Sequence, residues 1–168
     1  MNSRAIWGIS IAAIFAVSMI SAAYAGGHLL IDDITVEKPG RNGVAQSVHI
    51  EVSVVVPDPT GADYGWAVGT SKGFLVITSH PNIGDDSTGQ PPLNAYHTHF
   101  LTADSGGPCD PLPHATFATK NEVGKLSIMG DMIWVKNVPR GLAGDLTESG
   151  FGFTLFTSGG DLCINPVP

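Results

Sequence analysis

Turn-forming residues interrupt this chain so often that long helices are excluded. The 168 residues include 21 glycines and 12 prolines, and no stretch after residue 25 keeps a helical stripe of apolar residues for ten positions. Charged residues make up 14% of the chain, against about a quarter in an average domain, so a coiled coil and a disordered chain are both disfavoured. Short strands joined by turns are the remaining way to build a core, and we expect an all-β fold.

The clearest strand spans residues 47–56, where valine and isoleucine alternate with polar residues. This period of two is typical of a strand with one buried and one solvated face. Several short strands separated by Gly/Pro turns favour a Greek-key β-sandwich of the immunoglobulin type with seven or eight strands. The other predicted strands are Leu29–Val36, Phe74–Thr78, Tyr96–Thr102, Ala115–Thr119, Leu126–Val135, Phe151–Thr157 and Leu162–Ile164.

Residues 1–25 have the features of a cleaved signal peptide. Arg4 gives a positive start, an apolar run follows, and Ala23-Tyr24-Ala25 places small residues at the positions that signal peptidase recognises. An uncleaved membrane anchor is the alternative, because the apolar run approaches the roughly 20 residues that cross a bilayer. We therefore expect a secreted, cell-surface or periplasm-like protein with a single β-sandwich domain over residues 26–168. A membrane contact is expected only through an uncleaved leader.

Both cysteines, Cys109 and Cys163, follow the leader. In an oxidising compartment a disulfide between them is the default expectation. The alternative is two separate thiols, in which His49, Cys109 and His114 would have the residue types of a blue-copper site. No methionine follows His114 closely, and Cys163 would remain without a partner, so the disulfide is favoured.

The pair His97-x-His99 is the main candidate for a metal site. Positions i and i+2 of a strand point to the same face, so the two imidazoles can bind one ion, and imidazole is a suitable ligand for copper or zinc. His49 is interpreted as solvent-facing because it lies on the polar side of its strand. His80 is interpreted in the same way because it precedes Pro81 in a turn.

The order of His97, His99, Cys109, His114 and Cys163 resembles that of secreted copper/zinc superoxide dismutases. The resemblance covers residues 96–136 and the C-terminal cysteine. It implies a Greek-key sandwich of the superoxide-dismutase type, in which His97 and His99 bind copper and His114 bridges two metal ions. It also implies that Cys109 and Cys163 form the disulfide.

Three departures from the family pattern argue against dismutase activity. Lys136 stands where the last copper histidine is expected, no histidine follows His114, and residues 158–162 contain no arginine. A redox cycle needs copper held in two oxidation states and a positive group that attracts the anion. The favoured function is therefore non-catalytic copper or zinc binding at His97, His99 and His114. The alternatives are a degenerate dismutase-like enzyme and a metal-free structural or adhesive surface module.

Cleavage after Ala25 would create a second candidate metal site at the new N-terminus. The mature chain would begin Gly26-Gly27-His28, whose amine, two amide nitrogens and imidazole suit square-planar Cu(II) or Ni(II). Glycine at the first two positions lets the backbone wrap the ion without Cβ clashes. The alternative is that His28 simply begins the first strand.

The remaining partner and enzyme classes receive no support. A net charge of −7 makes the phosphates of a nucleic acid an unsuitable partner. The sequence contains no P-loop, dinucleotide fingerprint, His-Glu-x-x-His or Gly-x-Ser-x-Gly motif. A metal ion is the partner that the sequence indicates.

Overall fold

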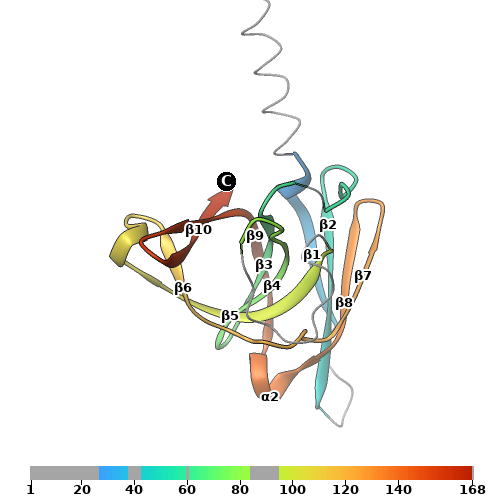
Figure 1. Cartoon of the computed structure of the whole chain (residues 1–168). Helices are drawn as coiled ribbons and strands as arrows, with labels where there is room; N and C mark the ends of the chain where they lie inside the picture. Colours follow the sequence, from blue (N-terminus) through green and yellow to red (C-terminus); the bar gives the residue numbers. More distant parts are fainter. Residues whose placement is uncertain (1–26, 38–42, 60, 84–94, 168) are drawn as a thin grey trace, which may run out of the picture.

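The computed structural model describes residues 27–37, 43–59, 61–83 and 95–167, so the predicted leader lies outside the described residues. The described chain contains two 3-10 segments, η1 (Gly27–Leu29) and η2 (Gly107–Cys109), and a short helix, α2 (Arg140–Ala143). None of its helices has the length and apolar character that a bilayer crossing requires. The strands, shown in Figure 1, are β1 (Ile31–Glu37), β2 (Ala45–Val52), β3 (Tyr64–Thr70), β4 (Gly73–Ser79), β5 (His97–Ser105), β6 (Pro113–Ala118), β7 (Lys125–Met129), β8 (Met132–Pro139), β9 (Leu146–Ser158) and β10 (Asp161–Val167).

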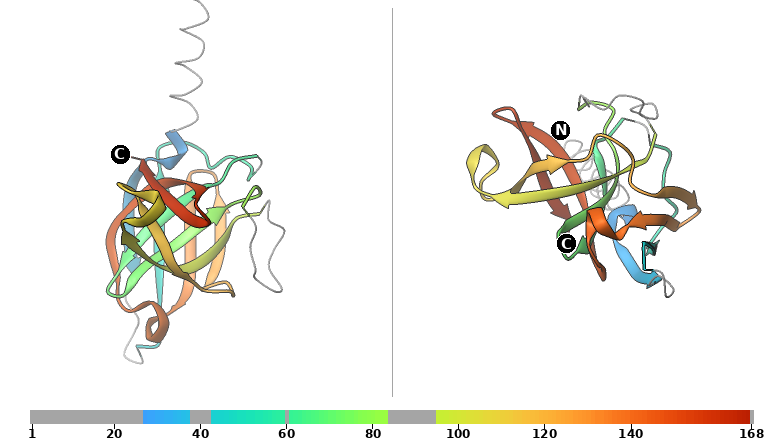
Figure 2. Two further views of the ribbon diagram at one scale, coloured as in Figure 1. Left: turned by 60° about the vertical axis from the view of Figure 1, so that its left-hand side comes forward. Right: turned by 90° about the horizontal axis from the view of Figure 1, so that it is seen from below.

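These strands form two antiparallel sheets, which confirms the predicted all-β sandwich. The first sheet has the order β1-β2-β8-β7, and the second has the order β10-β6-β5-β4-β3-β9. The second sheet curls until its two ends meet, because β10 pairs with β9 on one side and with β6 on the other. It is therefore a closed barrel, with β6 and β10 lying far from β7 (Figures 1 and 2).

The barrel gives the molecule two apolar cores instead of one. The larger core lies between the sheets and includes Ile50, Trp66 and Ile133, none of which is exposed to solvent. The smaller core lies inside the barrel and includes Ala67 and Phe153. Trp66 and Ala67 are neighbours on β3 that point to opposite faces, so one strand serves both cores.

The described chain has ten strands, whereas seven or eight were predicted, and two differences account for the larger number. β3 was not predicted, because it is buried on both faces and contains two glycines, so it shows no alternation of polar and apolar residues. At Gly65 an added Cβ would collide with the backbone of Ile77, so the close approach of β3 and β4 requires glycine there. The predicted single strand Leu126–Val135 is the hairpin β7–β8, which turns at Gly130 with φ of +67°.

A disulfide joins Cys109 to Cys163, with their Cα atoms 5.5 Å apart, and confirms the predicted pairing. It ties η2 to β10 beside the seam where β10 meets β6. Because the Cys109 sulfur is bonded to another sulfur, it is not available as a thiolate ligand. The blue-copper alternative built on His49, Cys109 and His114 is therefore wrong.

Candidate metal centre

Three buried histidines meet where β4 ends and β5 begins. The predicted pair His97 and His99 lies on β5, and His80 directly follows the last residue of β4. Their exposed fractions are 7% for His80, 1% for His97 and 6% for His99. One nitrogen of each ring lies within 4.8 Å of the corresponding nitrogens of the other two, which is close enough for a shared ion.

The antiparallel pairing of β4 with β5 creates this group. Thr78 is the register partner of His97, and Val76 is the register partner of His99. His80 lies two residues beyond Thr78, so it continues the same face of β4 past the end of the strand. Its ring is thereby a diagonal neighbour of His97, and the two ring centroids are 4.6 Å apart.

Each of the three rings directs its Nδ1 at a backbone carbonyl oxygen. A carbonyl can only accept a hydrogen bond, so Nδ1 carries the hydrogen, and the neutral ring keeps its lone pair on Nε2. This arrangement is the usual support of a metal-binding histidine, because it fixes both the tautomer and the ring orientation. The acceptors are Ala95 for His97 (2.9 Å), Thr119 for His99 (2.6 Å) and Ile83 for His80 (3.2 Å).

The Nε2 atoms of His80 and His97 are 2.7 Å apart. With both Nδ1 hydrogens directed at carbonyls, two neutral rings would bring two lone pairs face to face at this distance. A metal ion between the nitrogens would relieve this repulsion, and so would a change of tautomer in which one ring carries its hydrogen on Nε2 and donates to the other. Tetrahedral Zn–N bonds of about 2.0–2.1 Å would separate the nitrogens by about 3.4 Å, so ring movements of about 1 Å or less would accommodate the ion.

The carbonyl that holds His99 belongs to a segment that is itself fastened to β5. Thr119 donates from its backbone N–H to the Phe100 carbonyl (3.0 Å) and accepts from the Phe100 N–H through its Oγ1 (3.1 Å). A few residues later, the Thr98 hydroxyl donates to the Val123 carbonyl (3.0 Å). The first two bonds join the backbone of β5 at its edge, and the third uses a side chain on the face opposite the histidines, so together they hold the supporting carbonyl in place.

The predicted third ligand, His114, does not join this group. It lies on β6 opposite Asp104, five residues beyond His99 along β5, which corresponds to roughly 16 Å of strand. Its neighbours Pro113 and Ala115 face the barrel interior, so the His114 ring points to the other side of the sheet. Its Nδ1 is buried and has no hydrogen-bond partner in the described part of the chain. The structure thus places His80 where the sequence analysis expected His114.

The interpretation of His80 as a solvated turn residue is wrong, and the sequence held a signal for its true place. His80 and His97 stand at the two ends of one connecting segment between consecutive strands. In an antiparallel pair the end of one strand lies beside the start of the next. His49, which was also interpreted as solvent-facing, is half-buried on the outer face of the first sheet. Its ring centroid lies 5.3 Å from that of Trp134.

The N-terminal candidate site is only partly described, because Gly26 lies outside the described residues. Gly27 and His28 belong to η1, where the His28 ring packs 4.8 Å from the Tyr64 ring and its carbonyl accepts the Trp66 indole N–H (2.9 Å). Burial lowers the pKa of His28. The site that depends on cleavage after Ala25 stays a prediction.

Tyr64, the first residue of β3, and Tyr96, directly before β5, form a pair that gives a spectroscopic prediction. The hydroxyls of Tyr64 and Tyr96 are hydrogen-bonded, Tyr96 also donates to the Pro57 carbonyl (2.9 Å), and burial raises the pKa of both phenols. These are the two tyrosines of residues 26–168. In a chain starting at Gly26, an absorbance titration should show neither phenol ionising near its ordinary pKa of about 10.

The same shifts predict how stability depends on alkaline pH. Because the folded-state pKa values are raised, the folded protein keeps protons above pH 10 that the unfolded chain has released. The free energy of unfolding should therefore fall as the pH rises above about 10. Titration in denaturant provides the control, since both phenols should ionise normally there. A tyrosine that titrates normally in the folded protein would contradict the prediction.

Comparison with known proteins does not place the chain in a family: no family model, no curated protein and no solved structure matches it.

Proposed function

We propose that this chain is an exported β domain that binds one copper or zinc ion through His80, His97 and His99. The observation that carries the proposal is the convergence of three rings that each bring one nitrogen within 4.8 Å of the others, while the Nδ1 of each ring faces a carbonyl. Neutral imidazoles suit both metals, and copper(II) binds a given nitrogen site more tightly than zinc. We therefore expect the site to bind copper(II) more tightly than zinc.

The proposed role is metal binding without redox turnover. The resemblance to superoxide dismutases implied a bridging histidine at residue 114, but His114 belongs to another face of the barrel. The three rings are also almost completely buried, with exposed fractions of at most 7%. A buried ion without the bridged second metal fits storage, transfer or a structural role better than dismutation.

Metal analysis of the purified protein tests this proposal. After loading with zinc and removal of excess ion, we expect one ion per wild-type chain, about one in His114→Ala, and almost none in His99→Ala. For copper, one extra residue before Gly26 removes the predicted N-terminal nitrogen set, so the remaining copper reports on the three histidines. Equal metal content in wild type and His99→Ala would refute the site. Superoxide turnover by the copper-loaded protein would instead favour the enzyme alternative.

A further inference from the structure

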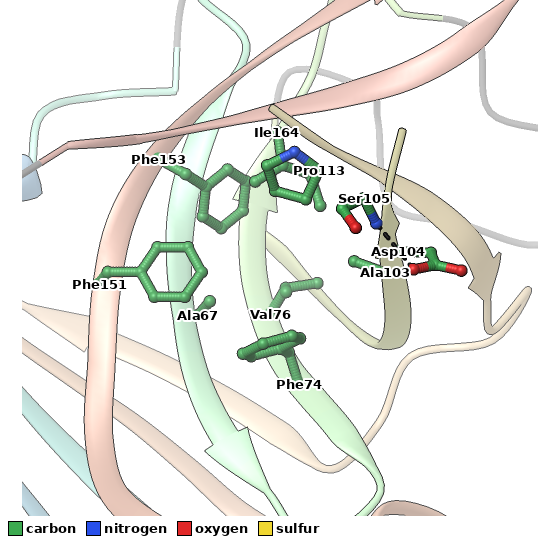
Figure 3. A pocket seen from close by; sticks show the side chains of 10 residues that line it. All are labelled: Ala67, Phe74, Val76, Ala103, Asp104, Ser105, Pro113, Phe151, Phe153 and Ile164. Atoms are coloured by element: carbon green, nitrogen blue, oxygen red, sulfur yellow. Dashed lines mark hydrogen bonds between the residues drawn. The ribbon is translucent and has the colours of Figure 1, made fainter. Parts of the chain in front are cut away.

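The barrel contains an apolar cavity of about 240 Å³ on the same inner face as the histidines. Phenylalanines from β4 and β9 form most of one side, and the wall opposite is β5 near its exposed end (Figure 3). The residues that line it are Ala67, Phe74, Val76, Ala103, Asp104, Ser105, Pro113, Phe151, Phe153 and Ile164.

The alternation along the strands places this cavity next to the candidate metal centre. On β5, His97, His99, Leu101 and Ala103 all face the barrel interior, because successive side chains of a strand alternate. Val76 both lines the cavity and is the register partner of His99. The cavity is nevertheless built from other side chains than the metal centre, so a ligand there does not depend on bound metal.

Small residues create the space. Ala67 on β3 and Ala103 on β5 occupy inward positions among phenylalanines, and the gap they leave is lined almost entirely by carbon. Water gains few hydrogen bonds in such a space, and the lining atoms lack dispersion partners while it is empty. An apolar cavity of about 150 Å³ suffices to bind benzene, so this one has room for a substituted ring or two fused rings.

The lining also indicates the kind of ligand. Phe74 and Phe151 are arranged edge to face with centroids 5.7 Å apart, and Phe153 lies 6.3 Å from Phe151. This geometry offers both ring edges and ring faces to a further aromatic ring. At the rim, the Ser105 hydroxyl points toward the cavity, and the carboxylate of Asp104 points away from it (Figure 3). A polar group at the mouth can therefore bond to Ser105, whereas an anion would be repelled by Asp104.

We infer that the barrel interior is a binding site for a small neutral aromatic molecule that carries one hydroxyl or N–H group. The ring would lie among Phe74, Phe151 and Phe153, and its polar group would lie at the mouth beside Ser105. The negative charge of Asp104 and of the whole chain, −7, weakens the binding of aromatic carboxylates of the same size. Saturable one-to-one binding that is weakened by filling the cavity is the signature that separates this site from a general apolar surface.

A fluorescence titration with 2-naphthol tests the inference, with 2-naphthoate as the matched anion. The titration uses wild-type protein in the presence of a chelator, so that failure of the metal proposal does not affect the result. We expect saturable one-to-one binding of 2-naphthol and affinity at least about tenfold weaker for 2-naphthoate. Absence of saturable binding, or equal affinity for the two probes, would overturn the inference.

Variants that fill the cavity locate the binding. Ala103→Phe and Ala67→Leu approach the space from opposite walls, and each should weaken 2-naphthol binding by about tenfold or more. Ala118→Phe is the matched control, because Ala118 is exposed on β6, outside the cavity lining, and it should leave the affinity unchanged. Circular dichroism checks that each variant folds, and the second filling variant covers the case in which the first does not. Unchanged affinity in a folded filling variant would contradict the assignment.

Discussion

Loading with zinc or copper should raise the free energy of unfolding by about 4 kcal/mol when the free ion is present at about 1,000 times its dissociation constant. The reason is that the ion binds a site that exists only in the folded chain, where β4 and β5 are paired. His97→Ala should abolish this increment, because His97 is the most deeply buried of the three ligands and contacts both others. Denaturant unfolding with and without metal measures it.

The design separates metal binding from the packing defect that the substitution creates. Each variant is compared with itself in the presence of chelator, so the stability lost through a smaller side chain cancels. His114→Ala is the control and should keep the full increment, since its ring lies on another face of the barrel. The increment should also shrink in acid, because imidazole binds metal only in its neutral form. An undiminished increment in His97→Ala would exclude the proposed site.

Removal of the disulfide should lower the free energy of unfolding by about 4 kcal/mol, according to the loop-entropy model for a closed loop. The separation of Cys109 and Cys163 is 54 residues, so the cross-link restricts a long part of the unfolded chain. A typical domain has only about 5–15 kcal/mol of stability, so this loss is a large fraction. Both sulfurs are buried, and Cys109→Ala with Cys163→Ala is the suitable replacement, since serine would bury two hydroxyls.

Urea denaturation with linear extrapolation measures the effect. Reducing agent should destabilise the wild type and leave the double variant unchanged, which controls for effects of the reagent itself. The loss should be accompanied by loosening of the β10–β6 seam, where one register pair, Cys163 with His114, closes the barrel. Metal binding should persist, because the three histidines lie on β5 and directly after β4, away from the seam. A loss below about 1 kcal/mol would show that the loop-entropy account fails for this cross-link.

Local pattern was sufficient to predict much of the fold. The period of two identified β2, and runs of β-branched and aromatic residues located most of the other strands. Strand β3 escaped detection because a strand buried on both faces, with glycines at close backbone contacts, has no alternation to detect. The closed barrel could not be predicted either, since closure depends on which strand β10 meets at each edge.

The candidate metal centre could likewise be predicted only in part from the sequence. Spacing along one strand places His97 and His99 on a common face, because alternation of side chains is a property of the extended backbone itself. The position of the third histidine depends on strand pairing and register, and a shift of one residue would move His80 to the opposite face. His114 is the opposite case. Its place in the sequence indicated a ligand, but the pairing of β6 with β5 places it far from the other histidines.

The amino-acid sequence by itself determined that the chain is all-β, that two imidazoles project from one side of a strand, and which two cysteines are available for pairing. Tertiary structure alone decided that His80 is the third member of the group and that the second sheet encloses an apolar cavity. The physical reason is that backbone geometry sets the direction of side chains within a strand, whereas contacts between strands are set by packing of the whole core.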